Sequence, residues 1–200
     1  MCQFIESIKI LDGEAMNLPY HQARFERTRS EILGLKNHPQ LENEILVPLT
    51  ARRGLFKCRI LYDHSEVRVD FHPHIKPEIS SLKLVSDNQI SYTYKSADRS
   101  ALGALFNLRG SCDDILIIKN GRITDSYFAN VVFWDGSRWL TPEKPLLEGC
   151  MRASLLKNGV INTADIQLKD LSRYKSLRLI NALNDWSDAP HLPLKALSTK

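Results

Sequence analysis

The 200-residue chain lacks the features that define several large classes of protein. It contains no apolar run near the ~18 residues that a membrane-spanning helix needs, no internal repeat and no low-complexity tract. Hydrophobic residues make up 43% of the sequence and charged residues 25%, which is close to the average of folded globular domains. This composition excludes a disordered chain, a collagen-like fibre and a coiled coil, and the length fits one large domain or two small ones.

Cysteines are few and scattered, and none belongs to a Cys-x-x-Cys pair: Cys2, Cys58, Cys112 and Cys150. This spacing argues against a disulfide framework and against a thiolate zinc site, and it predicts reduced, partly buried thiols. The start of the chain also lacks the basic residues and the apolar core of a signal peptide, so we expect a cytoplasmic protein.

The excess of positive charge is small, with a formal net charge of +4. A nucleic-acid-binding protein usually concentrates its basic residues on one face, whereas the basic doublet of this chain is Arg52-Arg53 and no recognition motif accompanies it. Nucleic-acid binding is therefore the weaker interpretation, because a small anionic ligand explains a modest surplus at least as well. We expect no nucleic-acid partner and no membrane association.

A cluster of histidines raises the alternative of a metal site. Asp70, His72 and His74 alternate along a predicted strand and, with His64, could offer ligands to zinc. However, Pro73 interrupts the strand and the spacing is not diagnostic of any metal site. We therefore predict that the chain has no metal centre.

Hydrophobic periodicity predicts a mixture of strands and helices in the first part of the chain. An alternating strand at residues 4–11 ends at the turn Asp12-Gly13, and a helix from Leu18 ends near Gly34. Two further strands follow at residues 55–62 and 67–71, on either side of a turn. Two prolines then interrupt regular structure, so we expect the passage between two domains to lie between residue 71 and about residue 89.

The second part of the chain has clearer signals. An alternating strand at residues 90–94 leads to Lys95, and a helix is expected at residues 100–108. Asn120-Gly121, a favoured pair for a tight type I′ turn, predicts a hairpin with strands at 115–119 and 122–124. Further predicted elements are a hairpin at 131–141, a short helix from Gly149 to Asn158-Gly159 and a late strand at 177–180. We predict an α+β fold with a domain at residues 1–85 and a larger one at residues 86–200.

Three features suggest one kind of chemistry when they are read together. Lys95 follows a predicted strand, Asp125 follows a hairpin strand, and Gly149-Cys-Met-Arg152 begins a predicted helix, whose first backbone N–H groups have no acceptor within the helix itself. Pyridoxal phosphate needs a lysine amine for its aldehyde, a carboxylate beside its pyridine nitrogen, and a helix N-terminus with an arginine for its phosphate. Each signal is weak alone, because isolated lysines and aspartates at strand ends are usually surface or turn residues.

The order of five segments resembles the fold-type IV (class IV) pyridoxal-phosphate enzymes. That family includes D-amino-acid aminotransferases, branched-chain aminotransferases and aminodeoxychorismate lyases, and the resemblance covers almost the whole chain. The matching segments are Tyr20-His-Gln-Ala-Arg24, Lys95-Ser-Ala-Asp98-Arg99, Thr124-Asp125 to Asn130, Leu146-Leu-Glu-Gly149-Cys-Met-Arg152 and Asn181-Ala-Leu. The chain departs from the family in having Asp125 where Glu is usual, Asp98 in place of Asn, and a shorter length than most members.

The resemblance implies a two-domain enzyme with pyridoxal 5′-phosphate between the domains, and a homodimer. Lys95 would form the Schiff base and act as general base, and Asp125 would keep the pyridine nitrogen protonated. The phosphate would be bound by Arg24, by backbone groups of Cys150 and Met151, and beside Asn181 and Ala182.

The substrate does not follow from the resemblance. A substrate carboxylate usually needs an arginine, and the candidates are Arg59, Arg68 and Arg99, of which the last could equally be structural. Among reactions on an amino acid or related amine, aminotransferase chemistry ranks slightly above 4-amino-4-deoxychorismate lyase chemistry. A homologue that binds the cofactor without turnover is the further alternative.

Overall fold

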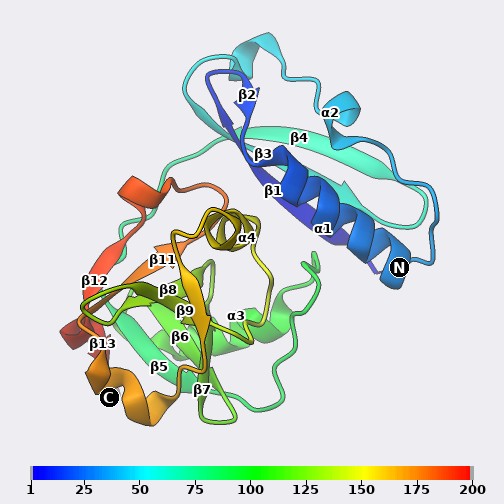
Figure 1. Ribbon diagram of the computed structural model, residues 1–200. Helices are drawn as coiled ribbons and strands as arrows, with labels where there is room; N and C mark the ends of the chain where they lie inside the picture. The colour runs from blue at the N-terminus through cyan, green and yellow to red at the C-terminus, as the bar shows by residue number, and fades with distance from the viewer. Residues whose placement is uncertain (1, 199–200) are drawn as a thin grey trace. The chain divides into compact units, whose positions relative to one another are not determined.

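The computed structural model describes residues 2–198, and their contacts divide the chain into two compact units (Figure 1). Unit 1 contains the described residues up to Lys76 together with Tyr94–Asp98, and unit 2 contains Pro77–Thr93 and the described residues from Arg99 onward. The sequence prediction instead placed a single boundary after residue 85. No helix of residues 2–198 is both long enough and apolar enough to cross a membrane.

Unit 1 is a four-stranded antiparallel sheet with one long helix on it. The strand order is β2-β1-β3-β4, with β1 at Phe4–Leu11, β2 at Glu14–Ala15, β3 at Leu55–Tyr62 and β4 at Val67–Pro73. The helix α1, at Leu18–Glu31, runs along the sheet in Figure 1. A four-residue helix α2 at Leu41–Glu44 and a 3₁₀ turn at Leu49–Ala51 lie between α1 and β3.

Local signals in the sequence account for the ends of these elements. Asp12 and Gly13 both have positive φ, which forms the tight turn between β1 and β2. Pro19 stands in the first turn of α1, where its missing N–H costs nothing, and Gly34 takes the left-handed conformation after the helix. The strands and helix predicted in this part are confirmed, although β4 continues to Pro73.

The core of unit 1 lies between α1 and one face of the sheet. Phe25 of α1 packs with Ile8 and Ile10 of β1 and with Ile60 and Tyr62 of β3, and all of these side chains are buried. Glu6 belongs to the same face of β1, because side chains of a strand alternate, so its carboxylate also faces α1. The sheet face that packs on the helix therefore carries one acidic residue.

Unit 2 is a larger mixed sheet that folds around a second core. Its main path runs β10-β9-β8-β7-β6-β5-β13, and β11 pairs with both β8 and β12. The strands are β5 Leu82–Ser86, β6 Asp114–Lys119, β7 Arg122–Ser126, β8 Asn130–Trp134, β9 Trp139–Pro142, β10 Asn162–Ala164, β11 Ser176–Ile180, β12 His191–Pro193 and β13 Leu197–Ser198. Helices are α3 Ser100–Phe106 and α4 Cys150–Lys157, with 3₁₀ turns at Asn107–Arg109, Leu168–Arg173, Trp186–Asp188 and Leu194–Ala196.

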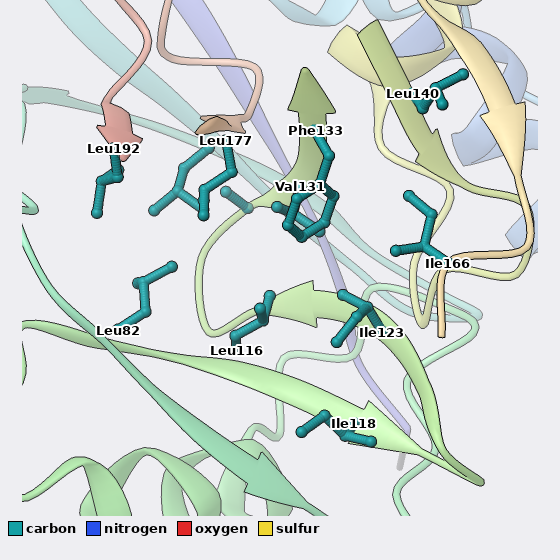
Figure 2. Packing of buried hydrophobic residues seen from close by; sticks show 12 residues of the cluster. Leu82, Leu116, Ile118, Ile123, Val131, Phe133, Leu140, Ile166, Leu177 and Leu192 are labelled. Atoms are coloured by element: carbon teal, nitrogen blue, oxygen red, sulfur yellow. The ribbon is translucent and has the colours of Figure 1, made fainter. Parts of the chain in front are cut away.

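The core of unit 2 is built from strands on opposite sides of the folded sheet. Figure 2 shows Leu82 and Leu116 on one side and Val131, Phe133 and Leu177 on the other, and all five side chains are fully buried. A second cluster joins α4 to the sheet through packing with β8 and β11. This packing fixes α4 against the strands that carry the candidate site.

One sequence prediction for unit 2 is wrong. Residues 90–94 form no strand, because their alternating apolar residues pack into different cores: Ile90 and Tyr92 pack in unit 2, whereas Tyr94 packs in unit 1. The passage expected between residue 71 and about residue 89 includes the change from unit 1 to unit 2 after Lys76, and this segment also contains β5, a strand that the sequence did not predict and that pairs in parallel with β6. The two hairpins, the late strand and both helices are confirmed, and Asn120 and Gly121 have the two positive φ angles of a type I′ turn.

Candidate active site

A β-bulge places Asp125. Leu116 pairs with Ser126 and Ile118 pairs with Ile123, so two residues of β7, Thr124 and Asp125, oppose the single residue between them on β6. A bulge turns side chains away from the regular alternation of a strand and is common beside active sites. Four consecutive side chains of β7, from Ile123 to Ser126, are buried as a result. Asp125 therefore lies within β7, rather than after it as the sequence predicted.

The Asp125 carboxylate is buried and held by three donors. The Asn130 amide donates to Oδ1 at 2.7 Å, the backbone N–H of Leu147 donates to Oδ2 at 2.9 Å, and the backbone N–H of Leu146 gives a third bond. Burial raises the pKa of Asp125 to about 6, because these bonds and the charge of Arg152 offset the loss of hydration only in part. The carboxylate is thus fixed in position but lacks a directly bonded cation among these contacts.

The N-terminus of α4 belongs to the same part of unit 2. Gly149 is the N-cap residue and no side chain caps the first turn, in which Cys150 and Met151 are buried. Arg152 donates to the carbonyl oxygen of Pro142 at 2.8 Å, which ties α4 to β9. The backbone N–H groups at this helix start are suited to bind an anion.

The Asn181-Ala-Leu segment follows β11 at the same edge. Ile180 of β11 pairs with Asn130 of β8, and Asn130 pairs with Asp125 of β7, so the three strands are in register here. The Asn181 side chain accepts a bond from the backbone N–H of Leu183 at 2.9 Å, which shapes the turn after the strand. The structure therefore brings together Asp125, the start of α4 and the turn after β11, which includes Ala182.

Unit 1 carries the other two predicted cofactor residues. The backbone carbonyl of Lys95 accepts a hydrogen bond from the N–H of Ile5 at 2.9 Å, and Ser96 forms a bridge with Phe4. Lys95 is half-buried, and its backbone is bound to the start of β1. Its partner there, Ile5, is the residue directly before Glu6. The lysine is therefore held by a strand edge, without the preceding strand that the sequence predicted.

Arg24 forms a buried ion pair with Glu6. Its Nε donates to Oε1 at 2.9 Å and its Nη2 donates to Oε2 at 2.6 Å, while Nδ1 of His21 lies 2.6 Å from the same Oε2. Burial alone would raise the pKa of Glu6, but the charge of Arg24 and the hydrogen bonds from His21 and Arg24 hold it at about 2. Glu6 thereby fixes the plane of the guanidinium that the resemblance assigns to phosphate binding.

The three candidate substrate arginines differ in their surroundings. Arg59 and Arg68 lie on the sheet face of unit 1 opposite to α1, because each is opposed in register by a residue of that face. Arg59 is half-buried, and Arg68 is exposed and pairs weakly with Glu66 at 3.4 Å. Arg99 instead lies 4.2 Å from the ring centroid of Tyr127 and donates to the carbonyl of that residue. This packing favours the structural role for Arg99.

Comparison with known proteins identifies the family. A sequence model described as "Amino-transferase class IV" matches residues 3–190. The chain belongs to the class IV aminotransferase family. Its mixed sheets and helices match the fold-type IV structures of this family, as the resemblance implied.

Three solved structures show the range of relatives. A provisionally named 4-amino-4-deoxychorismate lyase from Haemophilus somnus 129pt is 36% identical, with a TM-score of 0.86 over 92% of this chain and 97% of that one. A provisionally named amino-acid aminotransferase from Mesorhizobium loti is 22% identical, with a TM-score of 0.83 over 99% and 100%. A hypothetical aminotransferase from Mycobacterium tuberculosis, solved with pyridoxal phosphate bound, is 15% identical, with a TM-score of 0.78 over 99% and 84%. The two less similar structures show the shared fold alone.

Sequence reasoning gave no role to two buried polar residues that contact predicted cofactor residues. Glu6 and Asn130 both lie within the part of the chain that matches the family model, yet neither has a side chain of a type that the cofactor obviously requires. Each is buried and bonded to a predicted cofactor residue, Glu6 to Arg24 and Asn130 to Asp125. A polar residue within a predicted strand, as for Glu6, or directly before one, as for Asn130, was the available signal, because buried polar groups are normally hydrogen-bonded.

Proposed function

We propose that this protein is a pyridoxal-phosphate-dependent enzyme that transfers the amino group of an amino acid or a related amine. The observation that carries the proposal is the Asp125 carboxylate, which is buried and held in place by hydrogen bonds, and whose pKa burial raises to about 6. A carboxylate has about four acceptor positions, and three donors are present here. One position is left for a further donor.

A protonated pyridine nitrogen fits this position in number and in charge. Its N–H would be the fourth donor, and its positive charge would stabilise the ionised form of a carboxylate whose pKa is raised by burial. Asp125 is one methylene shorter than the glutamate usual in the family, and it extends from the bulge of β7. The residues present therefore fit the cofactor.

The remaining roles are assigned to residues of both units. Lys95 would hold the cofactor through its amine, and Nζ, when free as an amine, would accept the α-proton of the substrate as general base. Arg24 and the backbone N–H groups of Cys150 and Met151 bind the phosphate, with Asn181 and Ala182 beside it. Pyridoxal phosphate, when bound, supplies an electron-accepting ring that stabilises the charge left on the substrate carbon. Asp125 would hold the pyridine nitrogen in its protonated form.

A lyase is the second candidate function. The structure with 36% identity is a provisionally named 4-amino-4-deoxychorismate lyase, and the Lys95 and Asn181-Ala-Leu segments resemble those of the lyases. Lys95 and Asp125 would serve elimination as well as amino transfer, because both reactions begin with loss of a proton from the substrate. Arg59 is the more sheltered candidate for the substrate carboxylate.

Borohydride trapping tests the proposal. Purified protein is incubated with pyridoxal phosphate, reduced, digested and mapped by mass spectrometry, alongside Lys95→Ala and the surface control Lys157→Ala. We expect a pyridoxyl group on Lys95 in the wild type and in the control, and none at that peptide in Lys95→Ala. An adduct spread over surface lysines would contradict the proposal.

Substrate screening then separates the candidate reactions. Amino-acid donors are tested with a keto-acid acceptor, and 4-amino-4-deoxychorismate is tested for release of pyruvate. Amino transfer from the donors to the acceptor, without release of pyruvate from 4-amino-4-deoxychorismate, supports the aminotransferase. Release of pyruvate supports the lyase. Trapping on Lys95 with neither turnover favours the non-catalytic alternative. The homodimer, testable by light scattering, and the cytoplasmic location stay predictions from the sequence.

A further inference from the structure

We propose that Asn130 is a positioning residue that fixes the Asp125 carboxylate relative to the start of α4, and that Gly149 is glycine because it must accommodate the Asn130 amide. The inference rests on the proposed function. It extends that function by linking the group assigned to the pyridine nitrogen with the backbone assigned to the phosphate.

The amide of Asn130 has a single workable orientation. Its Nδ2 donates to Asp125 Oδ1 at 2.7 Å and to the carbonyl oxygen of Leu147 at 2.8 Å, which uses both of its hydrogens. Rotating the amide by half a turn would place Oδ1 against a carboxylate and a carbonyl, leaving two acceptors without donors. The residue is buried, so water cannot replace these bonds at low cost.

The bonds around Asn130 form a closed ring. Leu147 accepts from Asn130 through its carbonyl and donates to Asp125 Oδ2 through its N–H at 2.9 Å. Asp125, Asn130 and Leu147 therefore hold one another, and α4 begins three residues after Leu147, at Cys150. Movement of the carboxylate relative to the helix start requires breaking at least one bond of this ring.

Gly149 packs directly against the amide of Asn130. A Cβ added there would lie 2.0 Å from Asn130 Oδ1, far inside any contact distance. The backbone of Gly149 has φ −73° and ψ 144°, an extended conformation that any residue adopts. The requirement for glycine is therefore one of space, imposed by the amide of Asn130.

This arrangement matters because the pyridine nitrogen and the phosphate of the cofactor are parts of one small, largely rigid molecule. A protein that binds both ends gains most when their binding groups are already at the matching separation. Asn130 contacts the Asp125 carboxylate, which is assigned to the pyridine nitrogen. Gly149 is the N-cap residue of α4, whose first backbone N–H groups are assigned to the phosphate. Their close packing fixes that separation before the cofactor binds.

A double-mutant cycle tests the packing in the protein without cofactor. The variants are Asn130→Ala, Gly149→Ala, and the two combined, with Asn158→Ala at the exposed end of α4 as control. Urea unfolding should show that Gly149→Ala is strongly destabilising in the wild type and nearly neutral once Asn130 is alanine. Additive effects would overturn the steric part of the inference. This arm does not depend on cofactor binding, so it stays informative if the proposed function fails.

Binding and ¹⁵N spectra of pyridoxal phosphate test the positioning role. Asn130→Ala should weaken cofactor affinity about tenfold or more, and the resonance of ¹⁵N-labelled cofactor should move from the protonated toward the unprotonated position. Asn130→Ser, whose hydroxyl can donate one bond, should be intermediate and serves if Asn130→Ala folds poorly. Asn158→Ala should match the wild type. Unchanged affinity and an unchanged ¹⁵N shift in the Asn130 variants would overturn the role, whereas absence of binding by the wild type would instead refute the proposed function.

Discussion

Replacing Glu6 with glutamine should destabilise unit 1 far more than an equivalent change at an exposed ion pair. Glu6 is fully buried and accepts two hydrogen bonds from Arg24. Glutamine has nearly the same shape, so Glu6→Gln removes the negative charge without opening a cavity. The guanidinium of Arg24, itself 8% exposed, would remain buried without its counter-ion.

The magnitude follows from the pKa of Glu6. A carboxyl group whose pKa falls from 4.5 to about 2 on folding contributes about 3 kcal/mol to stability at pH 7. Removal of one partner from other buried ion pairs costs ~3–5 kcal/mol. We therefore expect Glu6→Gln to lower the free energy of unfolding by about 3 kcal/mol.

Urea unfolding at pH 7 measures this loss, with Glu66→Gln as the matched control. Glu66 forms an ion pair with Arg68 at 3.4 Å in which both side chains are more than half exposed, so its loss should cost less than about 1 kcal/mol. Because the pKa of Glu6 is lowered, the wild type should lose stability as the pH falls from about 4.5 toward 2. Glu6→Gln should lose less over this range.

Two results would refute the reasoning about Glu6. One is a Glu6→Gln variant whose stability at pH 7 equals that of Glu66→Gln. The other is an unchanged loss of stability between pH 4.5 and 2, which would mean that another group is responsible for it.

Three further predictions concern other parts of the chain. Because burial raises the pKa of Asp125 from 3.8 to about 6, the cofactor-free protein should lose about 3 kcal/mol of stability through this group as the pH rises from about 4 to 6. Burial also raises the pKa of Asp114 to about 6, so that residue contributes a loss over the same range. A urea series should show that Asp125→Asn removes the contribution of Asp125 and leaves that of Asp114, and an unchanged profile would exclude the assignment. Arg24→Lys should weaken pyridoxal phosphate binding about tenfold, because lysine lacks the fork that pairs with Glu6 and phosphate together; equilibrium dialysis showing equal affinity would argue against Arg24. Gly121→Ala should cost about 1 kcal/mol in urea unfolding, because φ is +73° there, and a neutral effect would contradict the type I′ turn.

Features set by local chemistry were predictable from the sequence. The Asn120-Gly121 turn and the helix between Gly149 and Asn158 depend on the conformations of a few neighbouring residues. β5 was missed because its partner strands, β6 and β13, are distant in sequence, and its own residues alternate only weakly.

The residues of the candidate site also fall into two groups: those that residue type and order predict, and those whose role depends on contacts between distant segments. Lys95 and Asp125 are reactive side chains that could be proposed from residue type and order. The role of Asn130 depends on a bulge in β7 and on a loop 17 residues further along the chain. The strand expected before Lys95 is absent because Tyr94 packs with Phe4, a contact that no local periodicity encodes.

The route of the chain limits how this protein can be divided. The backbone passes from unit 1 to unit 2 after Lys76, returns for the five residues Tyr94–Asp98, and leaves again. No single cut in the gene therefore yields two complete units: a fragment starting at Pro77 would carry Lys95 but not β1, the strand whose edge holds it. The short segment with the reactive lysine thus makes the two units inseparable as genetic modules: recombination that exchanges unit 1 must also replace these five residues, and recombination that exchanges unit 2 must keep them.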